Sequence, residues 1–61
     1  MKTYTVTAFD KGGNILLNKQ FTAASEIEAK TQGEQLLIDN NMMELTHRCI
    51  SSSGKLLLFH S

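Results

Sequence analysis

The chain carries the stretch Phe9-Asp10-Lys11-Gly12-Gly13-Asn14-Ile15-Leu16-Leu17, and its pattern returns near the other end as Ile50-Ser51-Ser52-Ser53-Gly54-Lys55-Leu56-Leu57-Leu58. In both stretches an apolar residue leads into a polar turn that contains glycine, and three aliphatic residues follow. Glycine adopts the positive φ that a tight antiparallel connection requires without a steric penalty. Each stretch therefore predicts a β-hairpin, with Gly13 and Gly54 at equivalent positions.

The residues before the first turn alternate between apolar and polar side chains, which is typical of a strand with one buried face. A connection centred on Gly12 and Gly13 keeps apolar side chains opposite one another. The register that it predicts pairs Asp10 with Ile15, Ala8 with Leu17, and Tyr4 with Phe21. Lys19 then falls opposite Val6, and we expect its ammonium to extend past the sheet edge or a bulge to rotate it outward.

The segment between the hairpins predicts a helix from about Ser25 to Asn40. Ser25 precedes Glu28 by three residues, the spacing of a capping box. One helical stripe contains Ala29, Gly33, Leu36, Leu37 and Asn40. A glycine in mid-helix costs about 1 kcal/mol relative to alanine, so we expect a close approach to the sheet at Gly33. Ile27 and Ile38 lie on a separate flank, and asparagines at 40 and 41 suit a left-handed C-cap.

The second hairpin is predicted from strands at Glu44–Ser51 and Lys55–Phe59. Its transferred register pairs Ser51 with Leu56, Ile50 with Leu57, Cys49 with Leu58, Arg48 with Phe59, and His47 with His60. The fold class predicted is α+β, in the order ββαββ: a four-stranded antiparallel sheet with one helix packed on one face. Sixty-one residues provide for one domain, which we expect to span 1–61.

Composition favours a cytoplasmic location. One cysteine excludes an intramolecular disulfide and fits a reducing compartment. The first residues run directly into a strand pattern, so we expect no targeting peptide. No apolar run approaches the roughly 20 residues of a membrane-spanning helix. The net charge is zero, but the predicted helix is acidic and the remainder is basic, so we expect a dipolar molecule with a solvated helix face.

Four short strings along the chain form a recognisable pattern: Asp10-Lys11 with Gly13, Glu28-Ala29-Lys30 with Gly33 and Leu36-Leu37, Thr46-His47-Arg48-Cys49, and Gly54-Lys55-Leu56-Leu57-Leu58-Phe59-His60. In these strings the chain resembles the YhzD-like family of small Bacillus-type proteins. The resemblance spans nearly the whole chain. It implies a stand-alone cytoplasmic domain from a Gram-positive source, and it brings no activity, cofactor or site residue with it.

His47, Cys49 and His60 form the one cluster with chemical potential. Alternation puts His47 and Cys49 on one face, and the register sets His60 across from His47. Imidazole and thiolate are zinc ligands, but a structural site needs four ligands and no fourth is evident. A cysteine–histidine nucleophile pair also requires an activated thiolate and a cleft, which one helix on a sheet hardly provides. Zinc binding therefore stays an alternative, and we expect no cofactor and no enzyme.

Single-stranded nucleic acid is a second alternative, because an exposed sheet can stack bases on aromatic side chains. Phe9 and Phe59 would be the platforms, beside Arg48 and Lys55. The zero net charge and the lack of a basic run or an RNA-binding sheet motif make this alternative weak.

The remaining feature is the sheet face opposite the helix. The predicted register places five large apolar side chains on it: Phe9, Leu16, Ile50, Leu57 and Phe59. If the helix instead covers that face, the Val6, Ala8, Cys49 and Leu58 face lies open. Contiguous apolar surface usually marks an interaction site. We therefore expect a small non-enzymatic interaction module, either a homodimer or one bound to an unidentified protein partner, without a role at membranes.

Overall fold

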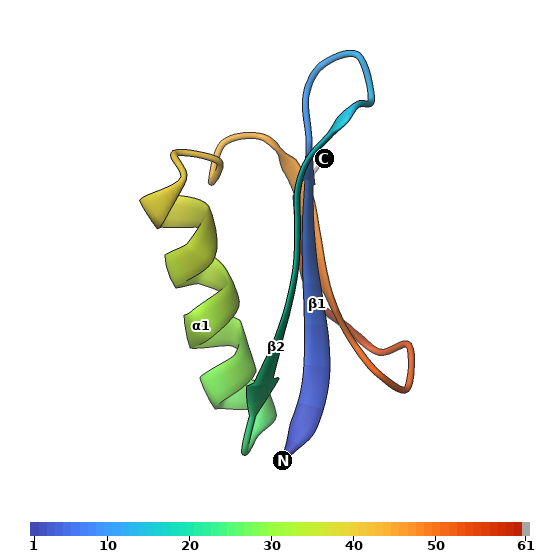
Figure 1. The fold of residues 1–61 in the computed structure, drawn as a ribbon, viewed down its shortest axis with the longest axis vertical. Coiled ribbons are helices and arrows are strands. Elements are labelled where there is room, and N and C mark those ends of the chain that lie inside the picture. Colours follow the sequence, from blue (N-terminus) through green and yellow to red (C-terminus); the bar gives the residue numbers. More distant parts are fainter. Residues whose placement is uncertain (61) are drawn as a thin grey trace.

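Two antiparallel hairpins join side by side to form one four-stranded sheet, and a single helix lies on one face of it (Figure 1). The computed structural model describes residues 1–60. Its elements are β1 (Lys2–Phe9), β2 (Ile15–Ala23), α1 (Glu26–Asp39), β3 (Thr46–Ser51) and β4 (Leu56–His60). The strand order is β2-β1-β3-β4, with every neighbouring pair antiparallel. The predicted ββαββ fold class is confirmed.

The two turns are built alike. In the first, the Asp10 N–H donates to the Asn14 carbonyl at 2.9 Å and the Gly13 N–H donates to the Asp10 carbonyl at 3.1 Å. In the second, Ser51 and Gly54 make the corresponding bonds with Lys55 and Ser51, both at 2.9 Å. Gly13 and Gly54 have φ values of 84° and 87°. The predicted equivalence of the two glycines is confirmed.

Close to each turn, however, the predicted register is wrong. Asp10 bonds to Asn14 rather than pairing with Ile15, because a left-handed glycine closes a tighter loop than we assumed. Phe9 therefore pairs with Ile15, and a bulge follows that skips Leu16. Beyond the bulge the predicted pairs Ala8 with Leu17 and Tyr4 with Phe21 are confirmed, and Lys19 lies opposite Val6 with an exposed side chain.

The second hairpin repeats the same irregularity. Ile50 pairs with Leu56 instead of Leu57, Ser51 bonds to Lys55 instead of pairing with Leu56, and the bulge skips Leu57. The predicted pairs Cys49 with Leu58, Arg48 with Phe59 and His47 with His60 are confirmed. In both hairpins the bulge takes up the residue that the tight turn displaces, so that apolar side chains farther along still meet.

The hairpins are related by an approximate two-fold axis perpendicular to the sheet. Thr7 of β1 and Arg48 of β3 are paired in the centre of the sheet. They are 41 residues apart in the sequence, as are the two turn glycines, Gly13 and Gly54. The axis therefore passes through the Thr7–Arg48 pair, and the two turns project from opposite ends of the sheet (Figure 1).

Capping bonds fix both ends of α1. The Ser25 hydroxyl accepts from the Glu28 N–H at 3.1 Å, and the Glu28 carboxylate accepts from the Ala24 N–H at 3.3 Å, one residue earlier than a capping box predicts. At the other end Asn41 has φ 57°, and the Met42 N–H donates to the Leu37 carbonyl at 2.7 Å. The predicted left-handed termination is confirmed, in the form of a Schellman motif.

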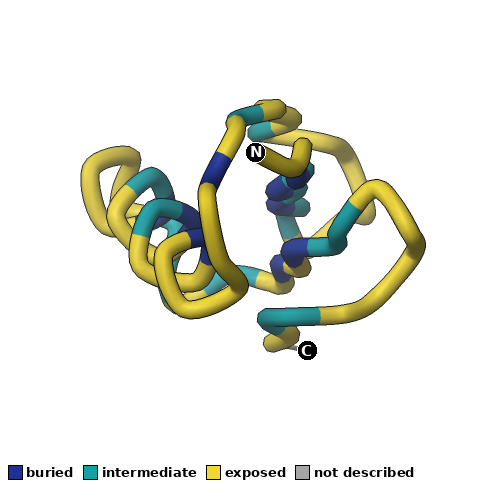
Figure 2. The backbone as a smooth tube through the Cα atoms, turned by 90° about the horizontal axis from the view of Figure 1, so that it is seen from below, coloured by how far each residue is buried: buried dark blue, intermediate teal, exposed yellow. Residues whose placement is uncertain are grey.

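The core lies between α1 and the face of the sheet that carries Tyr4, Val6 and Ala8, which decides between the two faces that the sequence left open. Figure 2 shows the helix on one side, with its buried residues turned toward the strands. The fully buried set is Tyr4, Val6, Ala8, Ala23, Ala29, Leu37 and Cys49. Ile27 and Ile38 are 79% and 51% exposed, in keeping with their separate flank.

Candidate interaction surface on the open sheet face

The sheet face turned away from α1 is called the open face below. Side chains alternate across a sheet, so the strand register determines its rows. One row holds Ile15, Phe9 and Thr46; the central row holds Asn18, Thr7, Arg48 and Phe59; and a third holds Gln20, Thr5, Ile50 and Leu56. Two apolar pairs, Phe9 with Ile15 and Ile50 with Leu56, thus lie on either side of a central row that is polar except for Phe59.

The five residues predicted for this surface do not stay together. Phe9, Ile50 and Phe59 belong to the rows of the open face, and Phe59 is 63% exposed. Leu16 sits at the first bulge and is 46% exposed. Leu57 sits at the second bulge and packs in part against the core cluster.

Ile15 and Leu56 take their places in the apolar rows. They are 59% and 51% exposed and pair with Phe9 and Ile50. The sequence analysis did not place Ile15 and Leu56 on this face, because the predicted register paired them with Asp10 and Ser51, one residue too close to each turn. The positions of the glycines could have predicted the correct pairing, because a three-residue hairpin loop that ends in a left-handed glycine shifts the strand register by one residue.

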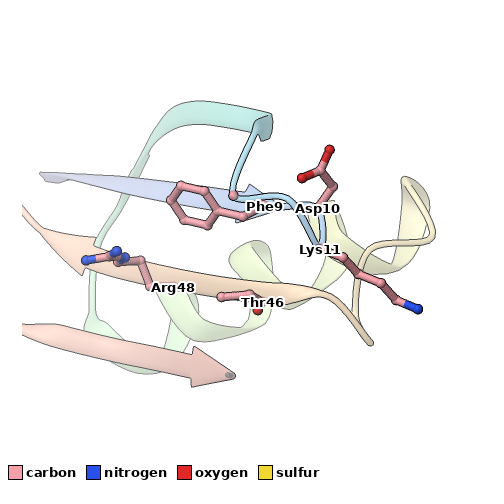
Figure 3. Close-up of a pocket in the computed structure, with 6 residues that line it drawn as sticks. Phe9, Asp10, Lys11, Thr46 and Arg48 are labelled. Carbon is pink, nitrogen blue, oxygen red and sulfur yellow. The ribbon is translucent and has the colours of Figure 1, made fainter.

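Arg48 stands over the ring of Phe9, with its guanidinium carbon 5.6 Å from the ring centroid. This cation–π contact is within the distance range of favourable pairs. Both residues line an open groove of about 410 Å³ together with Asp10, Lys11, Gly13 and Thr46. In Figure 3 the guanidinium and the Asp10 carboxylate lie on opposite sides of Phe9, and Lys11 extends away from it.

Asp10 is held in one orientation by its own turn. Its Oδ1 accepts from the Gly12 and Asn14 N–H groups at 2.8 and 2.9 Å, and its Oδ2 accepts from Asn14 Nδ2 at 3.1 Å. The bonds from the Asn14 backbone and side chain lower the pKa of the Asp10 carboxyl below its ordinary value. The carboxylate is therefore fixed within the first turn, where it accepts its hydrogen bonds from Gly12 and Asn14.

The predicted cluster of His47, Cys49 and His60 lies on the opposite, helix-covered face. His47 and His60 stack with ring centroids 5.4 Å apart, and His47 Nδ1 lies 2.9 Å from the Leu45 carbonyl oxygen. Within residues 1–60, no group of three histidine, cysteine or acidic side chains is arranged to hold a metal ion.

Cys49 is fully buried beneath the helix. Burial raises the pKa of its thiol, because the thiolate would lose its hydration there. A neutral, inaccessible thiol is neither a good nucleophile nor a good metal ligand.

Lys55 and Glu26 form an ion pair at 2.9 Å between the second turn and the first turn of α1. Both side chains are about half exposed, so water and salt screen the pair and it contributes little to stability. The basic sheet and the acidic helix thus meet in a contact that we did not predict.

Within residues 1–60, no helix is long and apolar enough to cross a membrane.

Comparison with known proteins finds a family model and a curated relative. The model of the YhzD-like protein family matches residues 1–61. The uncharacterized protein YhzD of Bacillus subtilis strain 168 is 48% identical over 60 residues, which cover 98% of each chain. No solved structure matches the chain.

Proposed function

The chain belongs to the YhzD-like family, and we propose that it is a non-enzymatic interaction module whose open face binds a second copy of the same chain. The observation that carries this proposal is the apolar surface beside Phe9 and Ile50. Ile15, Leu56 and Phe59 are each more than half exposed there, and α1 covers the other face. Several large apolar side chains exposed on one face of a sheet are typical of an interaction site.

The energetics favour an occupied face. A large apolar side chain left in water forgoes roughly 1.5–3 kcal/mol of burial. A domain of this size buries only about 60% of its surface and is marginally stable. Ile15 and Phe59 are 59% and 63% exposed, so covering them would recover part of this free energy, which matters for a marginally stable domain.

The charge on the open face favours a protein over a nucleic acid. Among the described strand residues, Arg48 is the one charged residue that alternation assigns to this face. Nucleic-acid affinity comes largely from several cations that contact phosphates. Asn18, Gln20 and the threonines of β1 supply polar contacts without charge, as in many protein interfaces.

A second copy of the chain is the simplest binding partner for the open face, because in a two-fold dimer the same surface is used by both copies. The molecule measures 33 Å along its longest axis and 15 Å along its shortest. The sheet is seen edge-on in Figure 1, so these two axes span its face. A footprint of 33 by 15 Å is small for an interface, since standard interfaces bury roughly 800 Å² of accessible surface per partner. We therefore expect a weak and reversible dimer.

Sedimentation equilibrium across a wide concentration range tests the proposal. The wild-type chain should show a mass that rises toward that of a dimer. Ile15→Gln, on the open face, should weaken the dimer by about 1.5 kcal/mol or more per copy through lost burial. Ile38→Gln is the matched control, because Ile38 is similarly exposed but lies on α1.

A monomer at every concentration would refute self-association. Equal weakening by both variants would refute the assignment to the open face. A labelled single-stranded oligonucleotide, titrated in parallel, separates the competing occupant: tight, salt-sensitive binding to a monomeric chain would favour nucleic acid instead.

A further inference from the structure

β2 is an edge strand of the sheet, and every second residue directs its main-chain groups outward. The Ser52 N–H donates to the Thr3 carbonyl at 3.0 Å, so Thr3 bonds toward β3. Main-chain groups alternate in direction along an antiparallel strand, so Tyr4 bonds toward β2, where it pairs with Phe21. By the same alternation, the outward-directed residues of β2 are Asn18, Gln20 and Thr22.

The other edge strand, β4, offers a shorter template. Its bulge skips Leu57, so only residues 58–60 are regularly paired beyond it. In β2 the regular pairing runs from residue 17 to residue 23. A long, regular and exposed edge is a surface on which a further strand can pair. β2 is therefore the edge that suits the addition of a strand.

A slot of about 250 Å³ lies between this edge strand and α1. It is lined by Phe21, Gln32, Gln35, Leu36 and Asp39. Gln35 donates to the Asp39 carboxylate at 2.7 Å, and Gln32 donates to the Glu28 carboxylate at 3.0 Å. These four helix residues are three or four positions apart, so they form one row along α1. The row beside β2 thus carries two carboxylates.

Lys19 lies on the same side of β2 as Phe21, and its side chain is exposed. Within residues 1–60 the one ion pair joins Lys55 to Glu26, so Lys19 has no ionic partner in the single chain. A lysine on an edge strand protects many proteins against strand addition. A strand that pairs with β2 must therefore keep like charges away from Lys19.

A second β2 meets this requirement when it runs antiparallel about a two-fold axis at Gln20. Gln20 then pairs with Gln20 of the second copy, and Asn18 pairs with Thr22 of that copy. This register uses the outward main-chain groups of all three residues in both strands. It also sets Lys19 opposite Phe21 of the second copy, beside that copy's slot and its acidic helix row. Side chains directly opposite one another in adjacent strands are in contact.

We infer that two copies join along β2 into one continuous antiparallel sheet, about a two-fold axis perpendicular to the sheet at Gln20. The Lys19 stem packs on Phe21 of the second copy, and its ammonium faces the Glu28 and Asp39 carboxylates there. This contact goes beyond the proposed function and is compatible with it. Both open faces lie on the same side of the joined sheet, so the small footprint of a single open face is doubled.

Amide hydrogen exchange, followed by NMR at increasing protein concentration, tests this contact. Where sedimentation shows nine chains in ten to be paired, the amides of Asn18, Gln20 and Thr22 should exchange about tenfold more slowly, because only the unpaired chain exchanges. The Phe59 amide is the control. It points outward on β4, since its partner Arg48 bonds toward β1, and its exchange should not change with concentration.

Variants test the main-chain contact and the charge separately, with the same exchange measurement. An N-methyl group on the Gln20 nitrogen, introduced by chemical synthesis, should weaken pairing at least about tenfold, because it removes the donor at the axis. The same group on the Phe59 nitrogen is the matched control. Lys19→Glu should weaken pairing about tenfold through repulsion at two symmetric contacts, whereas Lys30→Glu, with the same change in net charge, should not.

The outcomes separate this inference from the proposed function. A mass that rises with concentration while the edge amides keep the exchange rate of the monomer would refute edge pairing and leave the open-face dimer standing. Edge protection that persists in Ile15→Gln would support edge pairing independently of the open face. Equal loss of protection by N-methylation at Gln20 and at Phe59 would refute the assignment to β2. Stronger pairing in Lys19→Thr would show that Lys19 repels the second copy, which refutes the inferred register.

Discussion

Gly33 lies where α1 crosses the centre of the sheet. A Cβ at this position would be 3.3 Å from Leu58 Cδ1, 3.5 Å from Cys49 Sγ and 3.8 Å from Phe21 Cζ. The sequence alone predicted this close approach, because a glycine inside an apolar helical stripe has little other reason to be there. The tightest contact is with the tip of a flexible, half-buried leucine.

We expect Gly33→Ala to stabilise the fold by about 0.5 kcal/mol, since a gain of about 1 kcal/mol in helix propensity exceeds the cost of moving one methyl group. Gly33→Val should instead destabilise it by about 1–3 kcal/mol, because a branched side chain also presses on buried Cys49. Urea unfolding followed by circular dichroism measures both. Destabilisation by alanine as large as that by valine would mean that Leu58 cannot move.

Cys49 provides a second test at the residue scale. Because its thiol is buried and its pKa is raised, we expect a thiol reagent at neutral pH to react with the folded protein far more slowly than with the urea-unfolded chain. The folded-state rate should rise with the population of the open state, by about fivefold in Ser25→Ala, which loses a helix cap worth about 1 kcal/mol. Rapid labelling of the native protein would contradict the burial.

At the scale of elements, both hairpins require a positive φ at the glycine of the turn, Gly13 or Gly54. An added Cβ at Gly13 or Gly54 meets nothing within 4 Å, so the positive φ is the whole constraint. We expect Gly13→Ala and Gly54→Ala each to cost about 1 kcal/mol. Replacement by D-alanine, made by chemical synthesis, should be neutral or stabilising. A clear difference in the cost of L-alanine between the two positions would contradict their equivalence.

The elements differ in how far the sequence predicts them. Glycine spacing, the Ser25–Glu28 cap and strand alternation follow local rules, and they predict the turns, the helix and the far strand pairs. The bulges at Leu16 and Leu57 result from a conflict between a tight turn and a core that requires Leu17 opposite Ala8 and Leu58 opposite Cys49. Neither requirement alone reveals a bulge, so the open-face positions of Ile15 and Leu56 were not predicted.

At the scale of the whole molecule, surface carboxylates confer a dependence on pH. Hydrogen bonds from Asn14 to Asp10, and from Lys55 to Glu26, lower both pKa values below 3.8 and 4.5. A carboxyl with a lowered folded pKa stabilises the protein above its unfolded pKa, and this contribution is lost as the pH falls through the folded value. Stability should therefore decline below about pH 4.

Thermal unfolding from neutral to acidic pH measures this decline. Asp10→Asn with Glu26→Gln should be less stable than wild type at neutral pH and should lose less on acidification. Parallel curves for the two proteins would show that other groups govern the acid response.

The pairing between β1 and β3 has a consequence for how the chain folds. Each hairpin joins strands that are neighbours in sequence, but the central pair brings Tyr4 beside Ser51 across most of the chain. Local contacts form quickly, while distant contacts first require the closure of a long loop. During synthesis the first hairpin therefore emerges with one edge of β1 unpaired and must wait for β3. The centre of the sheet is completed only when β3 and β4 have left the ribosome. Until then the apolar residues of β1 lack their contacts with β3 and stay partly exposed to water.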